Sequence, residues 1–168
     1  KLRHRNTIGL PSTINNMNND QRPNAAADGE VVCFGVLSYL QLMVVDQVPR
    51  HDSGTPISRL TDSFGDDAGI VAWMLQQWGQ KARFIPSAVG ADDLGRKVAE
   101  TVQRLGVPVE VTVDPGVSTV AELSIADPSG ARTYFYQRTP ELLATLDSAD
   151  LTPLENASYL YVDWYDGD

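Results

Sequence analysis

Cysteine and histidine are scarce in this sequence, and their scarcity excludes several kinds of site. Cys33 is the single cysteine among 168 residues, so no disulfide can form within the chain. The two histidines, His4 and His51, are far apart and cannot assemble a usual zinc site with one cysteine. An unpaired cysteine is typical of a reducing compartment, and we expect a cytoplasmic location.

Positive charge and long apolar runs are also in short supply. Lysine and arginine number 13 against 22 aspartates and glutamates, which gives a formal net charge of −9. Nucleic-acid binding needs a cationic surface, so DNA and RNA are not expected partners. The longest apolar run, 31–45, is interrupted by polar residues and glycine. It falls short of the ~20 residues of a transmembrane helix, and no signal-peptide pattern opens the chain, so we expect no membrane association.

The composition changes sharply near position 30. Residues 1–30 are rich in asparagine and have no apolar periodicity, which predicts a tail or an extension outside the packed core. Residues 31–168 carry the apolar patterns of one folded domain. The apolar run 31–36 predicts a buried strand, and a second extended segment is expected over 40–45. The stretch 49–63, with its prolines and serines, is expected to be a loop.

Two segments have the apolar spacing of helices, and each is followed by a glycine suited to a left-handed C-cap. The stripe of the first helix, 68–78, is formed by Val71, Met74, Leu75 and Trp78, which are expected to face the core. The stripe of the second helix, which Asp92 or Asp93 caps, is formed by Leu94, Val98, Val102 and Leu105. Gly79 and Gly106 are the glycines that follow.

Strand patterns fill most of the remaining sequence. Segments 81–87, 107–113 and 158–164 are expected to be strands, and 119–126 and 131–136 flank a turn with proline and glycine. A short helix is expected over 140–146. The order of elements predicts an α/β fold with a parallel core and a small antiparallel sheet.

The stretch from Gly65 to Val107 resembles the ribokinase family, the carbohydrate kinases grouped with fructokinase and adenosine kinase. The resemblance is carried by the helix end Leu75-Gln76-Gln77-Trp78-Gly79, the strand 82–86, the block Val89-Gly90-Ala91-Asp92-Asp93-Leu94-Gly95 and the helix end Leu105-Gly106-Val107. Residues 118–134, with the turn Asp127-Pro128-Ser129-Gly130, are similar to the family's lid sheet. The resemblance implies an incomplete ribokinase-like three-layer α/β core with a small antiparallel β lid. It makes 31–168 the N-terminal half of such a domain, with lid strands at about 40–48 and 107–138.

The same resemblance sets the functional expectation. In the family, the second half of the chain carries the ATP site and the catalytic aspartate, and no segment here matches that half. ATP and Mg²⁺ are therefore implied at sites outside this chain, which alone is expected to be inactive. The implied function is the substrate-binding half of an ATP-dependent kinase that phosphorylates a hydroxyl of a sugar, sugar acid or nucleoside. A catalytically inactive kinase-like binding or scaffold protein is the alternative.

Carried over position by position, the resemblance gives four substrate-binding candidates near the first strand and the first helix: Gly35, Leu40, Gly65 and Asp66. In the family, an aspartate that grips sugar hydroxyls stands where this chain has Leu40, and a glycine stands where it has Asp66. An asparagine of the family aligns with Ile70. The apolar replacements Leu40 and Ile70 favour the inactive alternative.

Three further candidates lie near the C-terminus. Tyr136 and Arg138 alternate along the last lid strand and so share a face, and an arginine there could bind a carboxylate, as in the family's sugar-acid kinases. A face packed against a partner subunit is the other interpretation. Asp163 follows a buried strand, where α/β sheets place ligands, or is simply solvated. Uncovered sheet edges predict a homo-oligomer through the lid, or a partner that supplies the second half, with a sugar-like small molecule as ligand.

Overall fold

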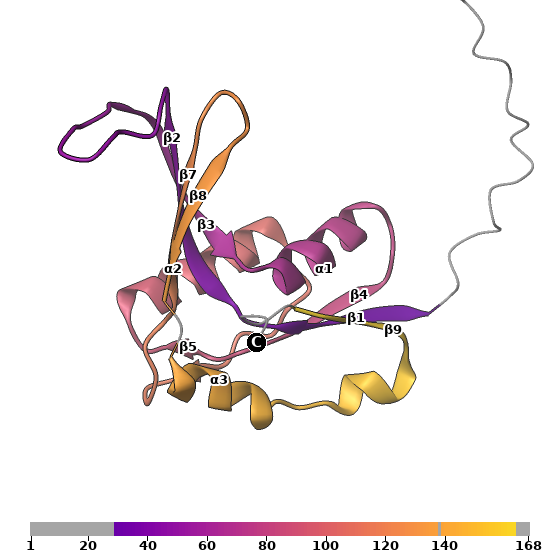
Figure 1. The fold of residues 1–168 in the computed structure, drawn as a ribbon. Coiled ribbons are helices and arrows are strands. Elements are labelled where there is room, and N and C mark those ends of the chain that lie inside the picture. The colour runs from indigo at the N-terminus through magenta and orange to yellow at the C-terminus, as the bar shows by residue number, and fades with distance from the viewer. Residues whose placement is uncertain (1–28, 138, 164–168) are drawn as a thin grey trace, which may run out of the picture.

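The described chain consists of a layered body and a second sheet that projects from it (Figure 1). The computed structural model describes residues 29–137 and 139–163. Residues 1–28 of the predicted tail and the candidate Arg138 lie outside the described residues.

The body is built on a parallel sheet with the strand order β4-β1-β9. β1 (Glu30–Gly35) pairs in parallel with β4 (Ala82–Pro86) on one side and with β9 (Ala157–Val162) on the other. Val32 and Cys33 in β1 are fully buried, because this strand is covered on both faces. The strands predicted at 31–36, 81–87 and 158–164 are confirmed as strands. The expectation that the last is buried is wrong, because β9 lies at the edge of this sheet and most of its side chains are exposed.

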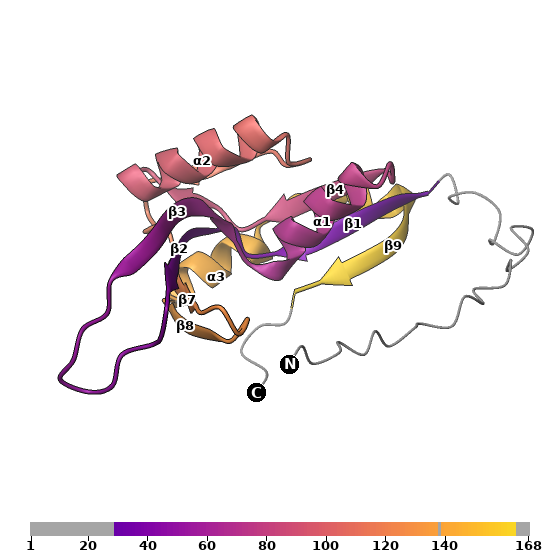
Figure 2. The same ribbon diagram turned by 90° about the horizontal axis from the view of Figure 1, so that it is seen from above.

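Helices cover the two faces of this sheet (Figures 1 and 2). On one face lie α1 (Asp67–Gln77) and α2 (Asp93–Leu105), and on the other lie α3 (Pro140–Asp147) and the 3-10 helix η2 (Thr152–Asn156). This arrangement confirms the predicted incomplete three-layer α/β core.

The second helix follows its sequence pattern closely. Val98 and Val102 are buried in the core, and Leu94 and Leu105 pack against it at its margin. Gly106 ends the helix with a φ of 65°, a left-handed conformation in which glycine has no steric penalty.

The first helix approaches the sheet most closely through its small residues, and of its predicted apolar stripe Val71 and Leu75 pack against the core while Met74 and Trp78 are exposed. Its buried residues are Ala68, Gly69 and Ala72. A Cβ on Gly69 would lie 3.0 Å from the Phe84 ring, so only small residues permit this close approach. The expectation that Trp78 belongs to the core is wrong, because its side chain is 68% exposed.

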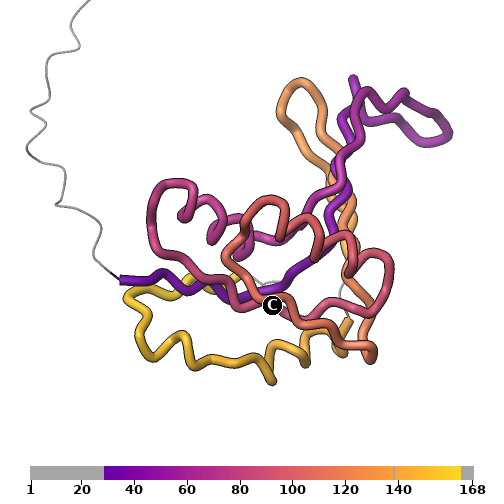
Figure 3. Tube along the Cα trace, turned by 180° about the vertical axis from the view of Figure 1, so that it is seen from behind, coloured from indigo at the N-terminus to yellow at the C-terminus, as the bar shows by residue number. Residues whose placement is uncertain are grey.

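The second sheet has the order β3-β2-β7-β8, and we call it the projecting sheet. Its strands are β2 (Ser38–Val45), β3 (Ile57–Gly65), β7 (Ala121–Ala126) and β8 (Arg132–Tyr136). The hairpins β2–β3 and β7–β8 are antiparallel, and the parallel pairing of β2 with β7 joins them. Seen from behind, both hairpins extend away from the helices (Figure 3). They form the small antiparallel unit that the resemblance implied.

Two boundaries of the expected lid differ from the structure. The loop expected over 49–63 is wrong in its second half, because Ile57–Gly65 forms β3. This is an edge strand whose residues are mostly polar and exposed, and pairing with β2 rather than burial holds it in place. Residues 107–114, expected at the start of the lid, instead join the body. There Val109 bridges Phe84, and the short strand β6 (Val113–Asp114) pairs with β5 (Val89–Gly90).

The main core fills the space between the parallel sheet and the pair α1 and α2. The lone cysteine lies within it, and burial raises the pKa of the Cys33 thiol to about 11. Cys33 is therefore a packing residue that stays protonated at neutral pH.

Candidate functional site

Gly35 and Asp163 meet at the carboxyl ends of β1 and β9, where open α/β sheets place ligands. The backbone N–H of Asp163 donates to the carbonyl oxygen of Phe34 at 2.9 Å, and its Oδ2 accepts from the Ala68 N–H at 3.3 Å. A Cβ on Gly35 would lie 2.4 Å from the Cβ of Asp163. Gly35 therefore leaves the room that lets a buried aspartate reach the first turn of α1.

Gly65 permits a similar close approach at the base of the projecting sheet. Ser38 pairs with Gly65 across β2 and β3. A Cβ on Gly65 would lie 2.5 Å from Ser38 Oγ and 2.8 Å from Glu122 Oε2, so both polar atoms pack closely against this glycine. Within the described residues, Ser38 Oγ is buried and has no hydrogen-bond partner. A buried hydroxyl without a partner is costly, and it is suited to bind a ligand group.

The two remaining candidates of the projecting sheet share the face on which Ser38 lies. Leu40 pairs with Glu122, and Glu122 pairs with Tyr136. Directly paired residues point to one face of a sheet. We call the face defined by Ser38, Leu40, Gly65, Glu122 and Tyr136 the pocket face. It combines a carboxylate and a hydroxyl with the apolar Leu40 and the half-exposed ring of Tyr136.

Asp66 connects this face to α1 and holds an unusual backbone conformation. It is the N-cap residue of the helix, with φ 72° and ψ 155°, and its side chain does not cap the helix. This region of backbone space is almost confined to glycine and costs about 1–3 kcal/mol for other residues. Such strain persists where the surrounding structure fixes the chain, and it is common at ligand sites.

The structure thus brings together most of the residues proposed from the sequence. Gly35 and Asp163 lie at the end of the parallel sheet, and Gly65, Asp66 and Leu40 lie at the junction of the projecting sheet with α1. Tyr136 extends the pocket face outward.

Sequence reasoning missed Ser38 and Glu122, which come together only through strand pairing. One signal was present, because Glu122 is a charged residue inside the otherwise apolar or small run 120–126.

Phosphate groups do not fit the helix N-termini of this site. The N-terminus of α1 carries Asp66 and Asp67, and Asp163 accepts from its Ala68 N–H. Carboxylates already occupy the positive end of the helix dipole, where a phosphate would bind. Among the described residues, no three His, Cys, Asp or Glu side chains are placed to hold a metal ion.

The second helix has an equivalent arrangement with a structural role. Asp92 Oδ1 accepts from the Gly95 N–H at 2.8 Å, and Oδ2 accepts from the Thr119 N–H at 2.9 Å. Burial raises the pKa of Asp92, but these hydrogen bonds outweigh burial and hold the pKa below its usual value. The expectation that an aspartate caps this helix is confirmed for Asp92.

A groove of about 750 Å³ lies away from these residues, along β4. Residues of β4, of the segment 108–114 and of the segment 145–153 line it. None of the site residues proposed from the sequence lines this groove. In the described part of the chain, no helix is long and apolar enough to span a membrane.

Comparison with known proteins identifies the fold. No protein-family model and no curated protein matches the sequence. Among solved structures, a protein assigned as a ribokinase from Agrobacterium tumefaciens superposes with a TM-score of 0.69 at 18% identity, over 80% of this chain and 44% of that one. Ribokinase from Giardia lamblia gives 0.61 at 19% identity, over 81% and 42% of the two chains. Ribokinase from Cryptococcus neoformans, in complex with ADP, gives 0.53 at 15% identity, over 65% and 34%.

This chain therefore has a ribokinase-like fold, as the sequence resemblance predicted. It spans less than half the length of each of these three proteins.

Proposed function

We propose that this chain is the substrate-binding and lid portion of a small-molecule kinase of the ribokinase type. The observation that carries the proposal is the buried Ser38 hydroxyl, which has no partner within the described residues and packs against Gly65 and close to the Glu122 carboxylate. A hydroxyl-bearing ligand, such as a sugar, a sugar acid or a nucleoside, would satisfy it. The neighbouring carboxylates would accept hydrogen bonds from further hydroxyls of that ligand.

In this function the chain positions the acceptor hydroxyl and excludes water. Phosphoryl transfer depends mostly on positioning and on electrostatic stabilisation by metal-bound nucleotide. Carboxylates already occupy the N-terminus of α1 at the candidate site, so in this proposal Mg²⁺ and ATP would be held by a second α/β unit. The projecting sheet would act as the lid that shields the transfer from water.

The surface on which that second unit would dock is an uncovered apolar side of the body. Along α1, Ile70, Met74 and Trp78 recur at intervals of four residues and are 37%, 36% and 68% exposed. Tyr159 and Leu160 of β9, the edge strand of the parallel sheet in Figure 2, are also exposed. An apolar edge strand beside an apolar helix stripe is a surface that stable proteins normally cover.

A second copy of the chain could use another apolar surface. Leu60 and Phe135 of the projecting sheet are 52% and 57% exposed. They lie on the face opposite the pocket face, because Leu60 pairs with Met43 and Phe135 with Leu123. Light scattering of the purified chain tests the expected association, and a stable monomer would contradict it.

Isothermal titration calorimetry with pentoses, hexoses, sugar acids and nucleosides tests the ligand proposal. One class is expected to bind, and Ser38→Ala is expected to weaken binding about fivefold, the value of a hydrogen bond worth about 1 kcal/mol. Ser53→Ala is the matched control, because Ser53 lies on an exposed loop and donates only to the Arg50 carbonyl oxygen. Absence of binding, or equal affinities of the two variants, would refute the proposal.

A kinase-like binding or scaffold protein without chemistry is the second candidate. Leu40 and the exposed Ile70 place apolar side chains where the family resemblance implies polar ones, which favours it. The intact mass of the protein purified from its source separates the two candidates. A polypeptide or complex of about twice this mass that hydrolyses ATP supports the kinase, and a ligand-binding protein without ATP turnover supports the alternative.

A further inference from the structure

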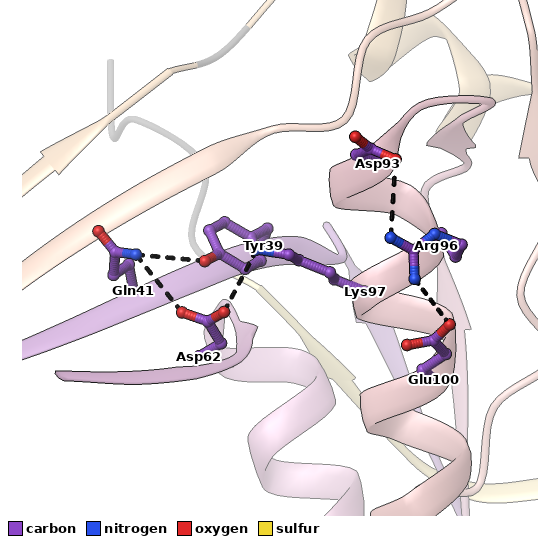
Figure 4. Close-up of polar contacts among 7 residues, drawn as sticks. All are labelled: Tyr39, Gln41, Asp62, Asp93, Arg96, Lys97 and Glu100. Atoms are coloured by element: carbon purple, nitrogen blue, oxygen red, sulfur yellow. Dashed lines mark hydrogen bonds and ion pairs between the residues drawn. The ribbon is translucent and has the colours of Figure 1, made fainter.

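A network of polar side chains joins α2 to the projecting sheet on the side opposite the pocket face (Figure 4). Lys97 of α2 lies 3.3 Å from Asp62 Oδ2 of β3. Gln41 of β2 donates from Nε2 to Asp62 Oδ1 and to the Tyr39 hydroxyl, each at 3.4 Å. The Lys97 ammonium also lies 5.2 Å from the centroid of the Tyr39 ring. Two strands of the sheet and one helix of the body therefore meet at Lys97.

The electrostatics of this network are mutually favourable. A hydrogen bond from the Tyr39 hydroxyl is the main cause that lowers the pKa of Asp62, and Lys97 and Gln41 lower it further. Hydrogen bonding to Asp62 raises the pKa of Lys97. Asp62 stays negative and Lys97 positive across the neutral range, so the ion pair persists there.

The Lys97–Asp62 ion pair lies where the projecting sheet leaves the body, so it can influence the position of the sheet. At the base, Phe64 and Tyr39 are buried in the core and anchor the sheet to the body. Asp62 lies one step further out on the same face, and Leu60, the next residue on that face, is already 52% exposed. In the described part of the chain, Lys97 provides the polar tie from α2 to these strands, and the strands beyond it extend away from the body.

We propose that Lys97 is a positioning residue that sets the angle of the projecting sheet relative to the candidate site. The inference rests on the proposed function in one respect, namely that this sheet serves as the lid. Lys97 acts through Asp62 on one strand and through the Tyr39 ring on the next. It does not touch the pocket face, so its effect on a ligand would be transmitted by the position of the sheet.

The adjacent residue, Arg96, is a matched control. It pairs with Asp93 and Glu100 of its own helix, at 3.6 Å and 2.9 Å, and makes no ion pair with the sheet (Figure 4). Removing the charge of Arg96 changes the net charge of α2 by the same amount as removing the charge of Lys97. It leaves the contacts between α2 and the sheet intact. Lys97→Met and Arg96→Met thus differ in whether the tie to the sheet is cut. Methionine keeps an apolar stem of similar length to that of lysine, without the charge.

Hydrogen exchange measured by mass spectrometry tests the proposal on the chain without ligand. In Lys97→Met, amides of β2 and β3 are expected to exchange about three- to tenfold faster, because one exposed ion pair and one cation–π contact are lost. Exchange in β1 and β4, and the melting temperature, are expected to stay near the wild-type values. Arg96→Met is expected to leave β2 and β3 unchanged.

Two further variants separate positioning from general damage. Lys97→Arg is expected to retain the protection of β2 and β3 amides from exchange. Lys97→Asp alone is expected to reduce this protection. The double variant Asp62→Lys with Lys97→Asp, which exchanges the two charges, is expected to restore it. Equal exchange of Lys97→Met and Arg96→Met would overturn the proposal, as would failure of the charge exchange to restore protection. These outcomes need no ligand, so they decide the role of Lys97 even if calorimetry refutes the proposed function.

Discussion

A methyl group at Gly35 tests whether this glycine allows the body to close around the candidate site. A Cβ there would lie 2.4 Å from the Cβ of Asp163 and 2.9 Å from the Cβ of Ala68. Both neighbours are attached directly to the backbone, so neither can rotate away. The substitution Gly35→Ala must therefore push β9 and α1 away from β1. Gly35 does not have a positive φ, so the effect is purely steric.

Overpacking of this kind costs about 1–3 kcal/mol in a close-packed interior. In a domain of this size each kcal/mol lowers the melting temperature by about 2–4 °C, so a decrease of about 4–8 °C is expected for a mid-range cost. Thermal melts followed by circular dichroism measure it. Ligand affinity is expected to fall as well, because the displaced Asp163 no longer accepts from the Ala68 N–H.

Gly54→Ala provides the control for this experiment. Gly54 lies on an exposed loop, and a Cβ there would meet no atom within 4 Å. Its melting temperature is expected to match or slightly exceed that of the wild type, because alanine restricts the unfolded chain. Equal melting temperatures for Gly35→Ala and Gly54→Ala would refute the steric reasoning.

Three other substitutions probe the site and its supports. Asp66→Gly is expected to raise the free energy of unfolding by about 1 kcal/mol, because glycine tolerates the positive φ of 72°; a loss of stability in thermal melts would show that contacts of the carboxylate outweigh the strain. Ser38→Ala is expected to stabilise the chain by about 1 kcal/mol in urea titrations, because a buried hydroxyl without a partner in the described residues is removed; destabilisation would contradict this. Asp92→Ala is expected to cost about 1 kcal/mol at neutral pH through loss of the helix cap. Because the pKa of Asp92 is lowered in the folded state, its ionised carboxylate stabilises the fold above the unfolded-state pKa of about 3.9, and this stability is lost as the pH falls through the folded-state pKa. The gap in free energy of unfolding between Asp92→Ala and the wild type is therefore expected to narrow in acid. A gap that stays constant down to that range would rule out this linkage.

Local signals explain which parts of the fold could be predicted from the sequence. The helix α2 has its cap, apolar stripe and terminal glycine within one short segment, and each signal agrees with the others. The strand β3 was missed because it lies at an edge of the projecting sheet, where no alternation of buried and exposed residues develops. Its structure comes from backbone pairing with β2, which sequence periodicity does not report.

The orientation of α1 could not be predicted for a different reason. Half of its apolar stripe packs against the core as predicted, yet its fully buried residues are small ones, Ala68, Gly69 and Ala72, and Trp78 is exposed. Both faces of this helix are apolar or small, so periodicity does not select between them. The phenylalanine rings under the helix decide the outcome, because they admit a glycine but no larger side chain.

The site shows the same division between local and tertiary information. The placement of Gly35 and Asp163 at one end of the parallel sheet was predictable, Gly35 from the family resemblance and Asp163 because it follows a strand of that sheet. The proximity of Ser38 and Glu122 was not, because they are far apart in the sequence and approach the same glycine, Gly65, only through the register of β2 with β3 and β7. Strand register depends on the whole sheet, so it leaves little trace in either segment alone.

Asp66 combines a backbone conformation typical of glycine with a charged side chain. The resemblance places a glycine there, and the backbone still adopts a conformation that favours glycine. The chain is fixed on both sides of it, by the contacts around Gly65 and by the hydrogen bond from Ala68 to Asp163, so the residue between them cannot relax. Stability alone would favour glycine at this position. Under the proposed function, the Asp66 carboxylate offsets that cost by contributing to ligand binding. If the variant Asp66→Gly is more stable but binds ligand less tightly, the aspartate lowers the stability of the chain and raises its affinity for the ligand.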